Sequence, residues 1–244
     1  MFAGKRVLVI GLARSGMAAL RVLNKRGAVL SAYDGKERAA LEKYLPELDN
    51  MGVVLYAGTM PPISRDNFDL IVISPGVPRD IEPVRIALQQ QVTIIGELEL
   101  AYLIKSEQVE IYAITGTNGK TTTTSLLNHI MVTDGRDSEA GGNIGVALCD
   151  LMDTKHTGVI VAEVSSFQLE GIQEFRPHIC GILNITRDHL DRHGTMENYA
   201  AMKSRIFENQ RDDDYVILNY EDDRVRDFAR LAPSQVIFFS VERR

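Results

Sequence analysis

The sequence predicts an α/β protein built from two domains, each with a mostly parallel β-sheet. Short apolar runs of strand length alternate with helical patterns along the chain, which is typical of parallel sheets joined by helices. A glycine-containing turn follows an apolar strand twice, at 11–16 and at 116–119. The length of 244 residues, with 45% apolar residues, is sufficient for two cores.

The first hundred residues contain five strand patterns, each a short apolar run. They lie at 6–10, 28–33, 53–56, 70–74 and 92–95. A helical pattern at 97–106 follows the last strand, so we place a domain boundary near residue 98 and expect domains at 1–98 and 99–244. Ser74 and Gly76 follow the fourth strand and are candidate ligand contacts, although Pro75-Gly76 is also an ordinary turn.

The turn at 11–16 connects the first strand to a helical pattern, and the second strand ends in Asp34. This order is typical of the βαβ unit that opens Rossmann-like, dinucleotide-binding domains. Ala13 stands where the middle glycine of G-x-G-x-x-G lets the backbone approach a pyrophosphate, which argues against ordinary NAD binding. Two interpretations stay open: a phosphate or nucleotide site, and a tight turn without a ligand.

The second glycine turn follows the apolar run 111–114 and precedes a helical pattern. Its backbone N–H groups and the helix N-terminus are suited to phosphate, Lys120 can reach the outer phosphates, and the Thr121 hydroxyl can bind Mg²⁺. The P-loop pattern G-x-x-x-x-G-K-[ST] is matched imperfectly, because Ile114 stands at its first position and the extra glycine is Gly116. The alternative is a glycine turn with a surface lysine. The helical pattern places four apolar residues on one face: Leu126, Leu127, Ile130 and Met131.

Polar side chains follow two later strand patterns. The strand 158–162 ends in Glu163, whose carboxylate could meet a phosphate-bound Mg²⁺, and the strand 179–183 precedes the polar segment 184–193. Singly, Asp188 could cap a helix, His189 could be a surface residue, and Lys203 on a helical pattern could be solvated. Beside a P-loop they indicate a metal and phosphate site. We expect a glycine-rich loop at 141–145 and further strands at 215–218 and 236–239.

Composition limits the classes of function. The net charge of −6 argues against a general nucleic-acid-binding or membrane-binding surface. The two cysteines, Cys149 and Cys180, suggest no disulfide framework, and we see neither a signal peptide nor an apolar run of transmembrane length. We therefore expect a cytoplasmic protein.

Three motifs together resemble the Mur ligase family over essentially the whole chain. They are Thr115-Gly-Thr-Asn-Gly-Lys-Thr-Thr122, Glu163-Val-Ser-Ser-Phe-Gln168, and Asn184-Ile-Thr-Arg-Asp-His-Leu-Asp-Arg-His193 with Lys203 downstream. The first motif is also found in folylpolyglutamate synthase. The Ser-Ser-Phe-Gln element, the turn Gly-Leu-Ala-Arg-Ser-Gly and Ser74-Pro-Gly76 are similar to the members that add D-glutamate.

The resemblance implies an ATP-dependent, amide-forming ligase of peptidoglycan precursor synthesis, with roles in cell-wall biogenesis, cell shape and cell division. ATP would phosphorylate the terminal carboxylate of UDP-N-acetylmuramoyl-L-alanine, and the amine of D-glutamate would displace phosphate from the acyl phosphate. Two Mg²⁺ sites and a carbamate on Lys203 are also implied. A carbamate makes a lysine an anionic oxygen ligand, which is the kind that Mg²⁺ prefers.

The resemblance also implies roles for individual residues. The catalytic residues would be Lys120, Glu163, His189 and Lys203, and the metal ligands would be Thr121, Glu163, His189 and Lys203. The ATP site would comprise Gly116, Thr117, Asn118, Gly119, Lys120, Thr121 and Thr122, with Asn219 and Asp223 near the adenine nucleotide. The UDP part of the substrate would contact Arg14, Ser15, Asp34, Lys36, Ser74 and Gly76, and its muramoyl-alanine end Asn143, Ser165, Gln168 and His189.

The chain departs from the family in one respect. Mur ligases have a third domain that binds the amino acid and closes on ATP, and we expect it to be absent from a chain that ends at Arg244. The chain would then be a fragment without the D-glutamate site, inactive in ligation by itself. Two other functions stay open: a P-loop ATPase or nucleotide-binding module without ligation, and an NAD-dependent oxidoreductase built on the turn at 11–16.

Overall fold

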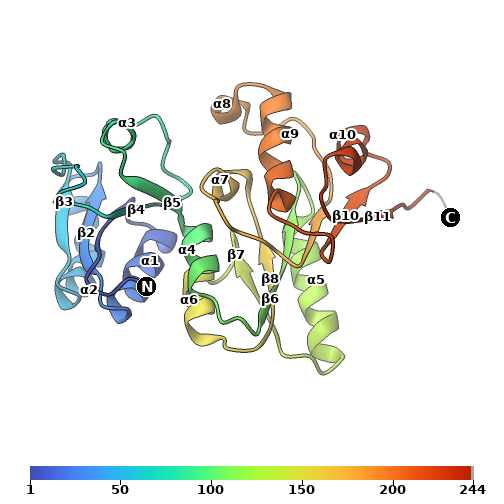
Figure 1. Ribbon diagram of the computed structural model, residues 1–244, viewed down its shortest axis with the longest axis horizontal. Helices are drawn as coiled ribbons and strands as arrows, with labels where there is room; N and C mark the ends of the chain where they lie inside the picture. Colours follow the sequence, from blue (N-terminus) through green and yellow to red (C-terminus); the bar gives the residue numbers. More distant parts are fainter. Residues whose placement is uncertain (243–244) are drawn as a thin grey trace. The chain divides into compact units, whose positions relative to one another are not determined.

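The computed structural model describes residues 1–242 and contains two compact units, each with its own parallel β-sheet (Figure 1). The first unit comprises Met1–Ala101 with Gly171–Gln173, and the second comprises the rest of the described chain. The two parallel sheets confirm the predicted α/β class. The units divide within helix α4 (Glu97–Ile104), the helix in which the sequence analysis placed the domain boundary.

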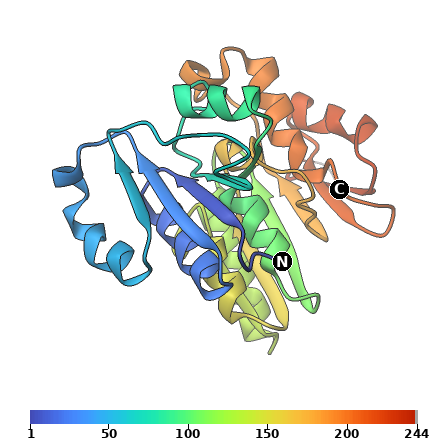
Figure 2. The same ribbon diagram turned by 60° about the vertical axis from the view of Figure 1, so that its left-hand side comes forward.

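The first unit has a five-stranded sheet in the order β3-β2-β1-β4-β5. Figure 2 shows its blue strands side by side. The strands are β1 (Arg6–Ile10), β2 (Val29–Asp34), β3 (Val54–Ala57), β4 (Leu70–Ile73) and β5 (Thr93–Gly96). Besides α4, the helices are α1 (Arg14–Lys25), α2 (Leu45–Asn50) and α3 (Glu82–Gln89), with a 3₁₀ helix at Arg38–Tyr44. The strand order reverses between β1 and β4, where open α/β sheets bind ligands.

The second unit has a six-stranded parallel sheet in the order β11-β10-β9-β6-β8-β7. The strands are β6 (Val109–Thr115), β7 (Ser138–Gly142), β8 (Gly158–Glu163), β9 (Ile179–Ile182), β10 (Tyr215–Asn219) and β11 (Gln235–Phe239). The helices are α5 (Lys120–Thr133), α6 (Leu148–Thr154), α7 (Ser166–Leu169), α8 (Leu190–His193), α9 (Met196–Ser204) and α10 (Asp223–Asp227), with 3₁₀ helices at Arg205–Phe207 and Phe228–Arg230. Helix α5 packs against β6, β7 and β8.

Two local expectations were wrong. Gly141 and Gly142 do not belong to a loop: they end strand β7 and pair with Ala162 and Glu163 of β8. Glycine, alanine and glutamate, which make up most of β7, have low β-propensity, so this strand depends on its partner rather than on its own residues. On α5, Leu126 and Ile130 are exposed, at 55% and 54%.

The face of α5 that meets the sheet has a different composition from the predicted one. Thr124 and Met131 are buried, and the half-buried Asn128 accepts a hydrogen bond from Ser138 of β7 (2.7 Å). These positions recur at helical spacing from Thr121, whose hydroxyl reaches Glu163. The face of α5 that meets the sheet therefore carries the polar residues Thr121 and Asn128, and the apolar Leu126 and Ile130 are exposed.

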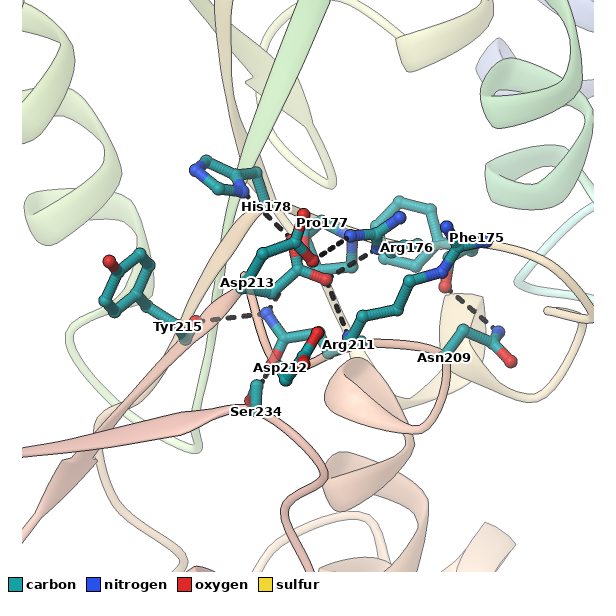
Figure 3. Close-up of polar contacts among 12 residues, drawn as sticks. Phe175, Arg176, Pro177, His178, Asn209, Arg211, Asp212, Asp213, Tyr215 and Ser234 are labelled. Atoms are coloured by element: carbon teal, nitrogen blue, oxygen red, sulfur yellow. Dashed lines mark hydrogen bonds and ion pairs between the residues drawn. The ribbon is translucent and has the colours of Figure 1, made fainter.

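A polar cluster secures the amino ends of β9 and β10 (Figure 3). The Asp214 carboxylate, with a side chain only 1% exposed, accepts from Arg176 Nε (2.5 Å) and the Arg211 N–H (2.8 Å), and it pairs with His178 Nδ1 (2.9 Å). Nearby, Gln210 Nε2 donates to two carbonyls. One belongs to Pro177, just before β9, and the other to Tyr215, the first residue of β10. This cluster lies at the strand ends opposite to the predicted site. In residues 1–242, no helix is both long and apolar enough to cross a membrane.

Candidate active site

The first unit brings its predicted substrate residues to the carboxyl ends of β1, β2 and β4. The Asp34 carboxylate ends β2 and accepts the N–H groups of Leu12 (2.8 Å) and Lys36 (3.1 Å). The Ser74 hydroxyl follows β4 and donates to the carbonyl of Gly11 (2.8 Å). Both side chains therefore support the glycine turn itself, and Gly76 and Lys36 lie exposed beside them.

The glycine turn is closely packed against the start of α1. A Cβ atom at Gly16 would lie 1.9 Å from the carbonyl oxygen of Gly11, so the turn requires glycine there. Ala13 is the N-cap and makes no side-chain capping bond, so no side chain of the N-cap residue satisfies the N–H groups in the first turn of α1. Such a helix start is suited to an anion.

In the second unit, strand β6 leads into the P-loop, and α5 begins directly after it. Gly119 is the N-cap with a left-handed φ of +83°, and no side chain caps the helix. The N–H groups of its first turn, from Lys120 to Thr122, have no partner within the helix. The Lys120 Nζ donates to the carbonyls of Gly116 and Thr117 (2.9 Å each), so in this structure it lies folded over the loop.

Thr121 and Glu163 converge from α5 and the end of β8. The Thr121 hydroxyl donates to one carboxylate oxygen of Glu163 (2.7 Å), and Asn143 Nδ2 donates to the other (2.7 Å). Glu163 is only 1% exposed. Hydroxyl and carboxylate oxygens are ligands that Mg²⁺ accepts, together with phosphate oxygens and water, so these residues fit a magnesium ion.

Lys203 is a buried lysine beside the P-loop. Its Nζ donates to the carbonyl of Gly116 (2.8 Å), which also accepts from Lys120, and lies 4.6 Å from the centre of the Tyr199 ring. Burial, with repulsion from Lys120 as the second cause, lowers the pKa of Lys203 to about 7. An amine with this pKa is substantially neutral at physiological pH.

His189 is the N-cap of α8 and has the positive φ of +50°, which is uncommon for a residue other than glycine. Its Nε2 lies 3.3 Å from the Asp188 carboxylate, and its ring lies 4.9 Å from that of Phe167. Within residues 1–242, no three or more histidine, cysteine, aspartate or glutamate side chains form a metal-binding group. Among the predicted metal ligands, Thr121 and Glu163 contact each other, whereas His189 contacts Asp188 and Phe167 instead.

Ser165 and Gln168 form a capping box at the start of α7. The Ser165 hydroxyl accepts the N–H of Gln168 (3.3 Å), while the Gln168 side chain accepts the N–H of Ser165 (2.9 Å). The next residue, Ser166, pairs with the buried His193 Nε2 (3.0 Å), and burial lowers the pKa of His193. The sequence analysis did not predict this pair. The one sequence feature that pointed to it is that Ser166 and His193 lie within the second and third family motifs.

The predicted adenine contacts differ in their placement. Asn219 ends β10 and donates to the carbonyl of Leu183 (2.8 Å), beside the segment that follows β9. Asp223 is exposed and pairs with Arg226 on its own helix. Its neighbour Asp222, which the sequence analysis passed over, accepts the N–H of Ile185 (2.7 Å) and also caps α10.

Comparisons with known proteins identify the families of the two domains. Residues 114–244 match the model of the Mur ligase middle domain, and residues 5–96 match that of the MurD-like N-terminal domain. Two relatives named UDP-N-acetylmuramoylalanine–D-glutamate ligase, from Thermoanaerobacter sp. (strain X514) and Pelotomaculum thermopropionicum, are each 47% identical over 97% and 98% of this chain. The chain spans about half of their length, 52% of each.

Solved structures support the fold. A UDP-N-acetylmuramate:L-alanyl-gamma-D-glutamyl-meso-diaminopimelate ligase from Neisseria meningitides superposes with a TM-score of 0.64 at 17% identity, covering 97% of this chain and 78% of that one. The UDP-N-acetylmuramate-alanine ligase MurC of Thermotoga maritima gives 0.54 at 24% identity, covering 98% and 53%. At these identities the likeness concerns the fold alone. The two domain matches and the relatives show that this chain belongs to the Mur ligase family.

Proposed function

We propose that this chain provides the UDP-substrate and ATP sites of a ligase that adds D-glutamate to UDP-N-acetylmuramoyl-L-alanine. Relatives of this name are 47% identical to it over nearly its whole length. The observation that carries the proposal is the cluster at the carboxyl end of β6 and β8, where the P-loop, Lys203 and the Thr121–Glu163 pair come together. Phosphoryl transfer depends on such positioning and charge neutralisation rather than on a covalent nucleophile.

The proposed reaction has two steps. A carboxylate oxygen of the substrate attacks the γ-phosphorus of ATP, the bond to ADP breaks, and an acyl phosphate forms. The neutral amine of D-glutamate then attacks the acyl carbon, phosphate leaves with the C–O bond pair, and the nitrogen loses a proton to give the amide. Lys120, freed from the loop carbonyls that it contacts here, would neutralise charge on the γ-phosphate.

Thr121 and Glu163 would hold Mg²⁺, with Asn143 fixing the carboxylate from its other oxygen. The ion would supply charge neutralisation on the phosphates. We further propose that Lys203 is carbamylated and, with His189, serves a second ion. The lowered pKa of its buried amine favours reaction with CO₂, because only a neutral amine can attack that carbon.

The first unit would bind the UDP part of the substrate. The uncapped start of α1 offers N–H groups to the diphosphate, with Arg14 and Ser15 in its first turn. Asp34, Lys36, Ser74 and Gly76 lie around the same sheet edge. In the second unit, Asn143, Ser165, Gln168 and His189 would meet the muramoyl-alanine end, and Asn219 and Asp223 would lie toward the adenine nucleotide.

Isotope transfer tests the proposed reaction in a chain of the relatives' length. With ¹⁸O in both oxygens of the substrate carboxylate, one labelled oxygen should leave in the released phosphate and one should remain in the amide. Lys120→Ala should reduce the rate on the order of a hundredfold or more. Lys43→Ala, at an exposed position, is the matched control. ATP hydrolysis without ¹⁸O in phosphate would instead identify an ATPase or nucleotide-binding module.

A further inference from the structure

We propose that Asn184 is the positioning residue that holds the P-loop in its phosphate-binding form, an inference that rests on the proposed ATP site. Asn184 follows β9, in the segment after Leu183, and is 66 residues away from the loop residue that it contacts. Its carboxamide makes two hydrogen bonds to the backbone of Asn118. The Asn118 N–H donates to Asn184 Oδ1 (2.8 Å), and Asn184 Nδ2 donates to the Asn118 carbonyl (3.0 Å).

Few side chains can make this bridge. It needs one acceptor and one donor side by side, which a carboxamide provides and a carboxylate, hydroxyl or ammonium group does not. The two bonds also determine the orientation of the amide, because a flipped carboxamide would place donor against donor. Asn184 therefore satisfies both backbone groups of a single loop residue, as a paired strand would.

Backbone contacts extend this bridge to the next residues. The Thr117 N–H donates to the carbonyl of Asn184 (2.9 Å), and the Thr117 hydroxyl accepts the N–H of Thr186 (3.0 Å). The segment from Asn184 to Thr186 thus runs along the loop and contacts it at consecutive positions.

Gly116 permits the close approach between the loop and the segment that begins at Asn184. A Cβ atom there would lie 3.1 Å from Leu183 Cβ and 3.3 Å from the Asn184 nitrogen, at a backbone φ of +152° that other residues rarely adopt. The segment after β9 therefore favours glycine at this position of the loop.

The bridge determines which N–H groups can bind phosphate. Those of Thr117 and Asn118 are already used in bonds to the Asn184 segment. The first turn of α5, from Lys120 to Thr122, retains its N–H groups because its N-cap Gly119 has no capping side chain. Asn184 does not itself need to touch the nucleotide: it fixes the strand-to-helix turn from which these groups project.

Calorimetry on the 244-residue chain tests this role with two probes, Mg·ADP and Mg·AMP. The variant Asn184→Ala should weaken ADP binding about tenfold or more, while AMP binding changes less, because the bridge serves the outer phosphate. The ratio of the ADP affinity to the AMP affinity should therefore fall. The matched control is Asn209→Ala, which removes another amide-to-backbone bond (Asn209 Nδ2 to the Phe175 carbonyl, 3.1 Å) at the amino end of β9 and should leave the ratio unchanged.

Amide hydrogen exchange of the unmodified chain gives a second measurement that needs no variant and no ligand. The Asn118 N–H should exchange slowly, like the N–H groups of β6, although it lies in a loop. Fast exchange there, or an unchanged ADP-to-AMP ratio in a folded Asn184→Ala variant, would overturn the inference. Slow exchange in a chain that binds no Mg·ADP would contradict the proposed function and the phosphate role of the loop, while the bridge itself would stand.

Discussion

Two buried lysines of the second unit show how their surroundings determine their chemistry. Lys155 is 5% exposed and pairs with Asp137 (2.6 Å) and Glu139 (3.2 Å). Burial opposes its charge, but the bonds to these carboxylates outweigh burial and raise the pKa of Lys155. Lys203 is as deeply buried and has a carbonyl, an aromatic ring and the cationic Lys120 around it, so its pKa is lowered instead. Both lysines are buried, so the groups around each amine decide whether its pKa is raised or lowered.

We predict that Lys203, and not Lys155, takes up CO₂. With ¹³C-bicarbonate, a carbamate carbon signal should grow as the pH rises through about 7, because the neutral amine becomes abundant above the pKa of Lys203. The signal should be absent from Lys203→Ala and unchanged in Lys155→Met. In a ligase-length chain, Lys203→Ala should lose most activity, and short carboxylic acids should restore part of it. A carbamate signal that persists in Lys203→Ala would contradict the assignment.

At the scale of elements, the strands β9 and β10 are tied at both ends. Their carboxyl ends support the candidate site, whereas their amino ends meet at the Asp214 cluster. Burial raises the pKa of Asp214, but the bonds from Arg176, Arg211 and His178 outweigh burial and hold that pKa below its usual value. The cluster therefore stabilises the fold while Asp214 is ionised, and this contribution is lost as the pH falls through its lowered pKa.

We predict that Asp214→Asn lowers the free energy of unfolding at neutral pH by about 2–4 kcal/mol, because Arg176 loses its buried partner. The difference from the unmodified chain should shrink at acid pH, where Asp214 is protonated in both states. Asp134→Asn, in an exposed pair with Arg136, should change stability by less than about 0.5 kcal/mol. Urea titrations at several pH values provide the measurement. Equal effects of the two substitutions would show that the Asp214 cluster contributes little.

At the scale of the whole molecule, the relatives are about twice as long as this chain, which spans 52% of each. The two units contain the proposed UDP and ATP sites, and ligases of this kind need an amine site and exclusion of water in addition. We therefore predict that the 244 residues bind UDP-N-acetylmuramoyl-L-alanine but do not form UDP-N-acetylmuramoyl-L-alanyl-D-glutamate. Calorimetry tests the predicted binding of the substrate, and an assay with radiolabelled D-glutamate tests the predicted lack of ligation. Robust ligation would show that the amine site lies within these residues.

The sequence by itself determined the class of the fold, nearly all strands and the two glycine turns. These features depend on neighbouring residues: an apolar run such as 70–74 or a glycine before a lysine is visible without any partner. The family motifs also gave Thr121 and Glu163 as candidate metal ligands, and in the structure the Thr121 hydroxyl donates to the Glu163 carboxylate (2.7 Å).

Only the tertiary structure decided which polar groups are already hydrogen-bonded within the protein. It assigned the N–H of Asn118 to Asn184, turned α5 so that Leu126 faces solvent, and placed Asp222 rather than Asp223 against the segment after β9. The tertiary structure also buries Lys203 beside Lys120, which lowers the pKa of Lys203. The neighbouring residues in the sequence suggest only an ordinary helical lysine. These outcomes depend on contacts between residues far apart in the chain, and spacing within a segment contains no information about what folds against it.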